Sequence, residues 1–321
     1  MVTVYLLLLA GLLLLFISGK FLVDSSVAIS HLFRIPTMII GLTVVAFGTS
    51  APELLVSMQA AFAGYPEIAI GNVVGSNISN ILIVLAITAI IYPIPVPANS
   101  VKRDWPIMMA VSVLLLIFSL NGWLSRVEGI LFVSLLVAYI VYTVFQTRRT
   151  KSNTARLIAG GSLKPIELEP VRMKWWVAGL IFLASCLGLA LGADLLVKNA
   201  AIIAETMGIS QRVISITMVA VGTSIPEVAT SVIAALKKET DISIGNILGS
   251  NIMNIISVLG FTTIVSPIRV ESAIARFDIP WMLATSVLLL LLMLPISRSK
   301  ITRWEGILMI VIYLLYIYLL F

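Results

Sequence analysis

Residues 43–57 read TVVAFGTSAPELLVS, and residues 217–231 read TMVAVGTSIPEVATS. The second segment repeats the first at a fixed offset of 174 in the numbering, with nine of fifteen positions identical. Each copy carries one glutamate, Glu53 or Glu227, in a stretch with no other charged residue. A charged side chain at the depth of a lipid bilayer is costly, so such a residue indicates a functional site. The repeat therefore predicts one cation site built from two half-sites.

The composition indicates a polytopic membrane protein. The 321-residue chain is 60% hydrophobic and 11% charged, whereas soluble domains carry about 25% charged residues. Charge-poor runs of about 17–25 residues are long enough to span a bilayer as helices. We count ten such runs and expect an all-α fold of ten transmembrane helices, near residues 2–19, 36–64, 68–92, 105–121, 127–146, 174–197, 210–236, 242–267, 279–296 and 304–321.

Other classes of protein are poorly supported. A single cysteine, Cys186, excludes an intramolecular disulfide framework, and His31 is the only histidine. The chain has no nucleotide-binding loop and no nucleophile elbow, so we expect neither an enzyme nor a bound cofactor. The net charge of +6 fits the surplus of Lys and Arg in cytoplasmic loops better than a nucleic-acid partner.

Basic residues distribute unevenly between the two sides that ten helices define. Sixteen of the 21 Lys and Arg residues fall on one side, including those of the 147–173 loop. Five fall on the other side, at Arg126, Lys198, Arg212, Arg269 and Arg276. The preference of positive loops for the inside then predicts both termini outside the cell membrane and the 147–173 loop in the cytoplasm.

A second repeated segment sets the architecture. Residues 70–81 read IGNVVGSNISNI and residues 244–255 read IGNILGSNIMNI, again at an offset of 174 and with nine of twelve positions identical. We therefore divide the chain into a five-helix repeat at 1–146, a linker loop at 147–173 and a second five-helix repeat at 174–321. An odd number of helices inverts the second repeat in the membrane, an arrangement typical of secondary transporters.

The GTSAPE segment predicts a broken helix that offers oxygen ligands. Pro52 frees the carbonyl of Gly48 from a helical hydrogen bond, and Gly48 leaves helical geometry easily. Carbonyl oxygens, the hydroxyls of Thr49 and Ser50, and a carboxylate suit hard cations such as Na+ or Ca2+. An alternative reading is that Ser50-x-x-Glu53 only caps a helix after a kink. Capping does not require an ionised residue, and it does not explain why both halves keep the same device.

The second repeated segment places polar groups along one helical face. Asn72, Ser76 and Asn80 recur every four residues, and Asn246, Ser250 and Asn254 repeat the spacing. Polar residues also tie membrane helices together without touching a substrate. That structural role stays open for four amides, which are Asn72, Asn77, Asn246 and Asn251.

Together the two segments resemble the paired alpha-repeats of the sodium/calcium exchanger family, within the cation/calcium antiporter superfamily. The residues that carry the resemblance are GTSAPE with GNVVGSNISN, and GTSIPE with GNILGSNIMN. The resemblance implies ten helices, with the second, third, seventh and eighth around the site, and exchange of Na+ for Ca2+ by alternating access. The 147–173 loop is too short for a regulatory calcium-binding domain, which favours the prokaryotic type.

The resemblance also implies ligands by position. Glu53 and Glu227 correspond to shared carboxylates for Ca2+ or Na+, and Thr49 and Thr223 complete the Ca2+ shell. One Na+ set is implied at Ala46, Thr49, Ser76 and Ser224, and its mirror image at Ala220, Thr223, Ser250 and Ser50. Asn80 and Asn254 correspond to the centre, where some relatives carry Asp. With Asn at both positions the site holds a formal charge of −2.

Two other functions remain open at this point. A Ca2+/H+ antiporter on the same scaffold is one, because buried glutamates can carry protons. A cation channel is the other, although an inverted repeat is typical of transporters. For the sodium/calcium exchanger that the resemblance implies, we expect the lipid bilayer as surroundings, Na+ and Ca2+ as the bound partners, and a protein that works as a monomer.

Overall fold

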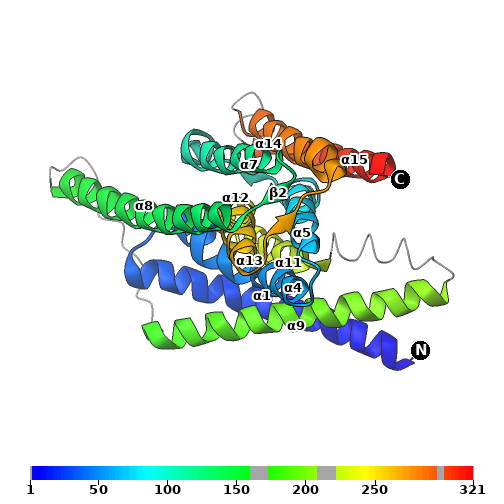
Figure 1. The fold of residues 1–321 in the computed structure, drawn as a ribbon. Helices are drawn as coiled ribbons and strands as arrows, with labels where there is room; N and C mark the ends of the chain where they lie inside the picture. The colour runs from blue at the N-terminus through cyan, green and yellow to red at the C-terminus, as the bar shows by residue number, and fades with distance from the viewer. Residues whose placement is uncertain (1, 160–172, 208–221, 295–299, 321) are drawn as a thin grey trace.

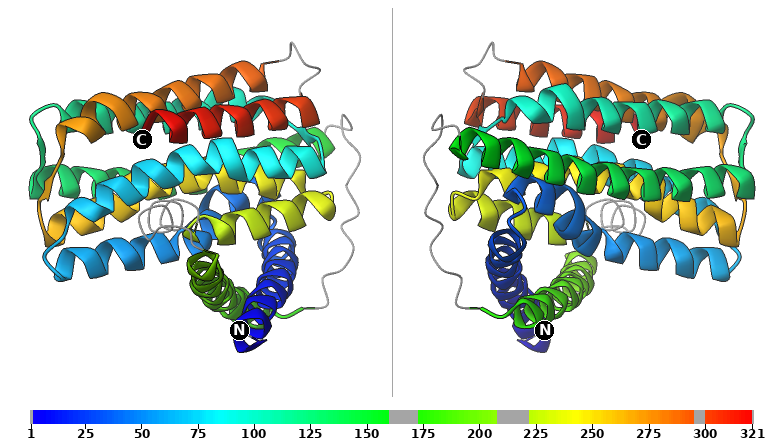
Figure 2. Two further views of the ribbon diagram at one scale, coloured as in Figure 1. Left: turned by 90° about the vertical axis from the view of Figure 1, so that its right-hand side faces the viewer. Right: turned by 90° about the vertical axis from the view of Figure 1, so that its left-hand side faces the viewer.

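The protein is a helical bundle with four two-residue strands in the part of the chain that the structure describes. The computed structural model describes residues 2–159, 173–207, 222–294 and 300–320. Helices α1 (Val2–Phe33) and α9 (Trp175–Thr206) lie side by side along one face, and α14 (Ile279–Met293) and α15 (Arg303–Leu320) lie on the opposite face (Figures 1 and 2). The predicted all-α membrane fold is confirmed.

The first half continues after α1 as a series of short helical pieces. Helix α2 leads into a π-helical segment η1, and α3 and α4 follow. The third apolar run is likewise divided into α5, η2 and α6. The bounds are α2 (Thr37–Ile40), η1 (Gly41–Val45), α3 (Ala46–Thr49), α4 (Ala51–Phe62), α5 (Glu67–Ser79), η2 (Asn80–Leu85), α6 (Ala86–Ile91), β1 (Ile94–Pro95), η3 (Ser100–Asp104), α7 (Trp105–Ser119), β2 (Trp123–Leu124) and α8 (Arg126–Ala159).

The second half repeats these pieces. From Ile225 to Met293 every element begins at an offset of 174 from its counterpart, or within one position of that offset, and β4 and α15 follow β2 and α8 at an offset of 177. The sequence repeat is therefore also a repeat of backbone conformation. The bounds are α11 (Ile225–Leu236), α12 (Thr240–Met253), η4 (Asn254–Leu259), α13 (Gly260–Val265), β3 (Ile268–Arg269), η5 (Ile274–Asp278), α14 and β4 (Lys300–Ile301), before α15.

Eight stretches of the described residues are long and apolar enough to cross a membrane, which makes the chain a multi-pass membrane protein. The predicted run at 105–121 corresponds to α7, a 15-residue helix that continues directly from η3. Of the run at 210–236 the structure describes only residues 222–236. The count of ten helices thus stays a prediction. The eight stretches are Val2–Phe33, Thr37–Phe62, Glu67–Ile91, Arg126–Gln146, Trp175–Thr206, Thr240–Val265, Ile274–Met293 and Arg303–Leu320.

Three helices are longer than the apolar runs that predicted them. One is α8, which continues from the run at 127–146 to Ala159, within the segment predicted to be a linker loop. The run at 2–19 stops at Lys20, but α1 continues to Phe33, and the run at 174–197 extends in α9 to Thr206. A charge ends an apolar run without ending a helix, because charged side chains have good helix propensity. In α1 the extension is also anchored, since Asp24 forms an ion pair with Lys237 beyond the end of α11.

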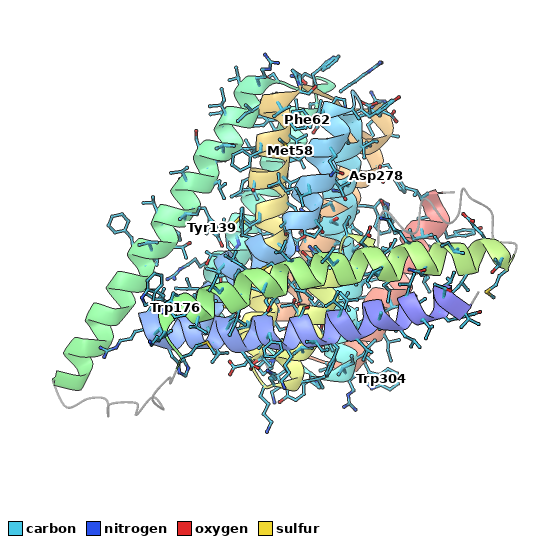
Figure 3. The ribbon with its side chains drawn as sticks, turned by 90° about the horizontal axis from the view of Figure 1, so that it is seen from below. Met58, Phe62, Tyr139, Trp176, Asp278 and Trp304 are labelled. Carbon is cyan, nitrogen blue, oxygen red and sulfur yellow. The ribbon has the colours of Figure 1, made fainter. Side chains whose placement is uncertain are left out.

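Short antiparallel strands join the two halves at both ends of the bundle. Strand β1 pairs with β4, with Ile94 opposite Ile301, and β2 pairs with β3, with Leu124 opposite Ile268. Each pair connects two loops that the charge pattern assigns to the same side of the membrane. Figure 3 agrees with that alternation, because Phe62 at the end of α4 and Trp304 at the start of α15 lie at opposite ends of the central helices.

Glycines allow the central helices to approach closely. A Cβ added at Gly249 of α12 would lie 2.5 Å from the carbonyl oxygen of Leu42 and 2.7 Å from the Cβ of Ala46. At Gly245, one turn earlier, the carbonyl oxygen of Met38 would be 2.8 Å away. Small residues at this spacing bring membrane helices into backbone contact. The second repeated segment of one half is therefore packed directly on the first segment of the other.

Reciprocal capping boxes begin α8 and α15. The Thr302 N–H donates to Oε2 of Glu305 at 2.5 Å, and the Glu305 N–H donates to Oγ1 of Thr302 at 3.5 Å. Ser125 and Glu128 repeat the arrangement. Such boxes satisfy backbone N–H groups that a helix start leaves without partners.

We expect Glu305→Ala to lower the free energy of unfolding by about 0.5–2 kcal/mol, the usual cost of a lost cap. Thermal unfolding of the purified protein measures this change, and transport should be retained because Glu305 lies outside the candidate site. Glu271→Ala, at an exposed glutamate, is the control for loss of charge alone. Equal unfolding temperatures of the two variants would contradict the assignment of a cap.

Candidate functional site

Glu53 and Glu227 lie in the first turns of α4 and α11. Both helices begin after a break at a serine, where Ser50 has φ −81° and ψ 5° and Ser224 has φ −85° and ψ 1°. A proline follows within the first two helical positions, as proline at a helix start favours. The broken helix that the sequence predicts is therefore present in both halves. Each break aims a carboxylate and the positive end of a helix dipole at the interior.

The two carboxylates come together although they belong to opposite halves. Both glutamates are fully buried, and their charges lie close enough to repel each other. Ser50, three residues before Glu53, donates its hydroxyl to Oε1 of Glu227 at 3.5 Å. The structure thus brings the two predicted half-sites to one place.

Several buried oxygens at this place have no hydrogen-bond partner among the described residues. They are both carboxylate oxygens of Glu53, Oε2 of Glu227, Oγ of Ser224, and the amide oxygens of Asn80 and Asn254. A buried polar atom without a partner is costly, and a buried charge without a partner is more so. Oxygen donors alone, two of them carboxylates, suit a hard cation such as Ca2+ or Na+. The donor set fits the predicted cation site.

Hydroxyl pairs from opposite halves surround the carboxylates. Oγ1 of Thr49 lies 3.4 Å from Oγ of Ser250, and Oγ1 of Thr223 lies 3.2 Å from Oγ of Ser76. The two Na+ sets that the resemblance implies place Thr49 with Ser76 and Thr223 with Ser250. The structure pairs Thr49 with Ser250 and Thr223 with Ser76, so each contact joins residues of different Na+ sets. The reason is the packing of α3 on α12, which brings Thr49 to Ser250.

Backbone carbonyls are the weakest part of the prediction. The carbonyl of Ala46, an implied Na+ ligand, accepts the Ser50 N–H at 3.0 Å, because α3 completes a helical hydrogen bond before the break. The Thr49 hydroxyl also contacts this carbonyl oxygen, at 3.4 Å. Its proposed mirror image, Ala220, lies outside the described residues.

The central amides are not equivalent. Asn80 begins η2 and Asn254 begins η4, and π-helical turns of this kind are frequent at functional sites. Nδ2 of Asn254 donates to Oδ1 of Asn77 at 3.1 Å, and Nδ2 of Asn77 donates to the carbonyl of Asn251 at 3.2 Å. Neither polar atom of the Asn80 side chain has a partner among the described residues. The amide nitrogen of Asn254 is therefore held in place and that of Asn80 is not, whereas the amide oxygens of both remain available to a ligand.

Sequence reasoning missed two serines that border the site. Ser57 and Ser231 are fully buried one helical turn after Glu53 and Glu227, and each accepts a hydrogen bond from an asparagine of the following helix. Their equal distance from the two glutamates, four positions in both halves, was the available signal. The asparagines that donate these bonds are among the four for which the sequence leaves a purely structural role open.

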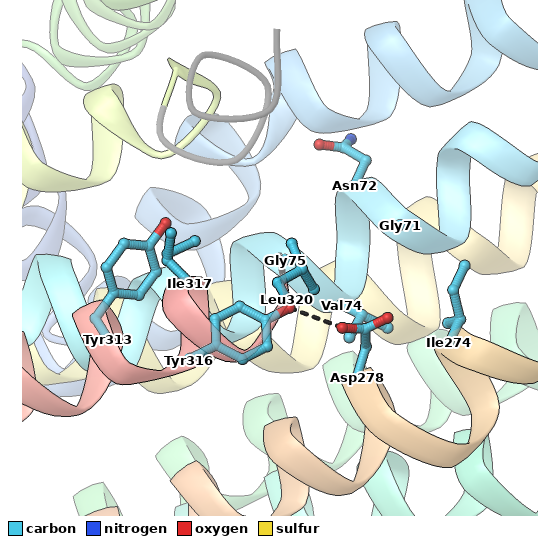
Figure 4. A pocket seen from close by; sticks show the side chains of 10 residues that line it. All are labelled: Gly71, Asn72, Val74, Gly75, Ile274, Asp278, Tyr313, Tyr316, Ile317 and Leu320. Atoms are coloured by element: carbon cyan, nitrogen blue, oxygen red, sulfur yellow. Dashed lines mark hydrogen bonds between the residues drawn. The ribbon is translucent and has the colours of Figure 1, made fainter. Parts of the chain in front are cut away.

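A cavity of about 310 Å³ lies behind Asn72. It is bounded by α5, by the junction of η5 with α14, and by α15 (Figure 4). Figure 4 shows Tyr316 and Asp278 directed toward each other across it, and the Tyr316 hydroxyl donates to Asp278 at 2.9 Å. The Asn72 side chain points away from this pair, so the cavity is adjacent to the candidate site and separate from its carboxylates.

Comparison with known proteins agrees with this geometry. The family described as sodium/calcium exchanger protein matches residues 3–148 and 177–321. The chain is 39% identical over 314 residues to the putative antiporter CaxA of Alkalimonas amylolytica, covering 98% of this chain and 97% of that protein. It is 33% identical over 351 residues to the sodium/calcium exchanger MaX1 of Methanosarcina acetivorans, covering 100% and 99%.

Solved structures show the same fold. The sodium-calcium exchanger NCX_Mj, soaked with 100 mM Na+ and 10 mM Sr2+, matches with a TM-score of 0.80 at 31% identity, over 99% of this chain and 98% of that chain. A second structure of NCX_Mj, soaked without Na+ and Ca2+, matches with a TM-score of 0.81 at 30% identity over the full length of both chains.

Proposed function

Because the chain belongs to the sodium/calcium exchanger protein family, we propose that it exchanges Na+ for Ca2+ across the membrane by alternating access. One observation carries the proposal, namely that two fully buried glutamates from opposite halves share one space with oxygen atoms that lack partners among the described residues. Such a group of oxygens matches the needs of Ca2+ and of Na+. The family itself supports an antiporter of cations and calcium.

Charge balance supplies the coupling. The two carboxylates carry a formal charge of −2, which one Ca2+ or two Na+ neutralise. A third Na+ makes the loaded site positive. An uncovered pair of carboxylates is too costly to carry through a low-dielectric interior, so we propose that the halves rearrange only when an ion set is bound. Either ion set then crosses, and the protein exchanges one for the other.

The proposed ligands are the twelve predicted from the sequence. Glu53 and Glu227 serve both ions, and the smaller groups complete the coordination shells. Of the twelve, the structure describes eleven, and Ala220 lies outside the described residues. The full set is Glu53, Glu227, Thr49, Thr223, Ala46, Ala220, Ser50, Ser224, Ser76, Ser250, Asn80 and Asn254.

The orientation and assembly follow from the same reading. We propose both termini on the outside and the 147–173 loop in the cytoplasm of a cell membrane, supported by the sixteen-to-five division of basic residues. The repeat division at 1–146 and 174–321 is supported by the offset between equivalent elements, which is 173 or 174 up to α14 and 177 for β4 and α15. Since one chain supplies both carboxylates, we propose that a monomer transports.

The decisive test is Ca2+ uptake by proteoliposomes that contain the purified protein. Vesicles loaded with Na+ and diluted into Na+-free medium at clamped pH are expected to accumulate 45Ca2+, and vesicles with equal Na+ on both sides are not. With more than two Na+ per Ca2+, an imposed membrane potential changes the rate, because each net charge moved is worth about 2.3 kcal/mol per 100 mV. Absence of Na+-driven uptake would contradict the proposal.

A Ca2+/H+ antiporter is the second candidate. The observation that favours it is the close approach of two buried carboxylates, since protons relieve their repulsion as well as metal ions do. The same vesicles decide between the two functions. Uptake driven by a pH gradient at equal Na+, together with no response to a Na+ gradient, would assign proton coupling.

A further inference from the structure

Two buried asparagines reach across the boundary between the halves. Asn72 of α5 and Asn246 of α12 occupy equivalent positions in the two copies of the repeated segment, and are 4% and 0% exposed. Oδ1 of Asn246 accepts a hydrogen bond from Oγ1 of Thr49 at 3.1 Å, and Oδ1 of Asn72 accepts one from Oγ1 of Thr223 at 3.5 Å. Each amide therefore contacts the threonine of the opposite half.

The opposite end of each amide is held by its own half. Nδ2 of Asn72 donates to the carbonyl of Glu53 at 3.3 Å and to Oγ of Ser57 at 3.1 Å. A carbonyl can only accept, so the amide nitrogen faces Glu53 and the amide oxygen must face Thr223. Nδ2 of Asn246 donates to Oγ of Ser231 at 3.2 Å, at the position equivalent to Ser57. The chain of contacts from serine through asparagine to the threonine of the opposite half thus occurs twice in one molecule.

The orientation of the threonine hydroxyl matters because it carries a single proton. When that proton points to an amide oxygen, the lone pairs of Oγ1 are left for a cation or for the neighbouring serine hydroxyl, Ser250 beside Thr49 and Ser76 beside Thr223. A carboxylate competes for the proton. The buried carboxylates of the site, Glu53 and Glu227, are the competing acceptors. A hydroxyl turned toward the carboxylate would present its proton to the ion and occupy a carboxylate lone pair.

We propose that Asn72 and Asn246 are positioning residues. Their amide oxygens accept hydrogen bonds from the hydroxyls of Thr223 and Thr49, so that the threonine oxygens face the transported cation. The inference rests on the proposed function, because hydroxyl orientation matters only if a cation binds between Glu53 and Glu227. It replaces the reading of these two amides as ties between helices. The asparagine of each half then prepares the ligand of the other half.

A double-mutant cycle tests the proposal on the purified full-length protein, with Ca2+ binding measured by isothermal titration calorimetry. We expect Asn246→Leu to weaken Ca2+ affinity about fivefold to tenfold, the effect of one hydrogen bond of ordinary strength. In the Thr49→Val background, which has no hydroxyl to orient, the same substitution should change affinity by less than about twofold. Asn72→Leu with Thr223→Val should reproduce the cycle.

Crossed pairs and a distant amide are the controls. Asn246→Leu combined with Thr223→Val should give independent losses, since these side chains belong to different chains of contacts. Asn199 of α9 is a buried amide that donates to the carbonyl of Leu195 in its own helix, and Asn199→Leu should leave Ca2+ affinity unchanged. An equal loss from Asn246→Leu with and without the Thr49 hydroxyl would overturn the proposal, because a tie between helices acts independently of that hydroxyl.

A second variant covers failure of the leucine variants to fold. Asn246→Asp keeps an acceptor oxygen for Thr49, so Ca2+ affinity should be retained or increased. A tenfold loss in this variant would overturn the proposal. Failure of the proposed function would be distinguishable from failure of this proposal. A protein that binds Ca2+ and shows coupling between the asparagine and threonine substitutions, but takes up Ca2+ without a Na+ gradient, would contradict Na+ exchange. The positioning role would stand in that case.

Discussion

Replacing Glu53 or Glu227 with glutamine is expected to abolish Na+-driven Ca2+ uptake. Either substitution halves the formal charge of −2 and leaves the remaining carboxylate to bind a divalent cation alone. Removing one partner from a buried ionic group costs about 3–5 kcal/mol, which corresponds to a rate or affinity loss on the order of a hundredfold or more. The measurement is the initial rate of 45Ca2+ uptake into proteoliposomes with an outward Na+ gradient.

The folded state should survive these substitutions. Glutamine has nearly the same volume as glutamate, and both oxygens of Glu53 lack partners among the described residues, so its replacement removes no protein hydrogen bond made by the carboxylate. Thermal unfolding in ion-free buffer is therefore expected to remain within a few degrees of wild type or to rise. Glu305→Gln is the matched control outside the site. Uptake at the wild-type rate in either site variant would end the assignment.

Gly249→Ala is expected to impair both stability and transport. The new Cβ would lie 2.5 Å from the Leu42 carbonyl oxygen and 2.7 Å from the Ala46 Cβ, and neither atom can move away by a rotamer change. Helix α12 must then separate from η1 and α3, at a cost of about 1–3 kcal/mol for overpacking and a fall of roughly 3–10 °C in unfolding temperature. Uptake should fall at least about tenfold because Ala46 and Thr49 are proposed ligands.

Gly179→Ala is the control for this experiment. Gly179 lies within α9, where an added Cβ meets no atom of the described residues within 4 Å, and alanine is the better helix former. We expect an unchanged or slightly higher unfolding temperature and normal uptake. Wild-type behaviour of Gly249→Ala would show that the close contact of α12 with η1 and α3 is not required.

The sequence predicts the centre of the molecule better than its periphery. Glu53 and Glu227 could be identified because an isolated charge in an apolar run has few structural explanations. The breaks at Ser50 and Ser224 could be identified because glycine and proline act through local backbone chemistry. These signals depend on a few neighbouring residues, and the repeat gives each of them twice.

Features that depend on packing between the halves could not be read in the same way. The ion pair of Asp24 with Lys237 is one such feature, because the two residues belong to different halves of the sequence. The contact of Thr49 with Ser250 depends on how closely α3 approaches α12. The pattern of hydrophobic residues does not predict the distance between two helices. The role of Asn246 is ambiguous in the sequence because an amide that ties helices and an amide that orients a ligand have the same pattern.

The pairing of strands from the two halves has a consequence for the order in which the protein folds during synthesis. Ile94 is synthesised early, yet its partner Ile301 emerges only with the last helix, and Leu124 likewise must wait for Ile268. A nascent first half therefore leaves the insertion machinery with two strand edges uncovered, each of which is a template for incorrect association. The strand edges of the first half are therefore covered only after β3 and β4 have been synthesised.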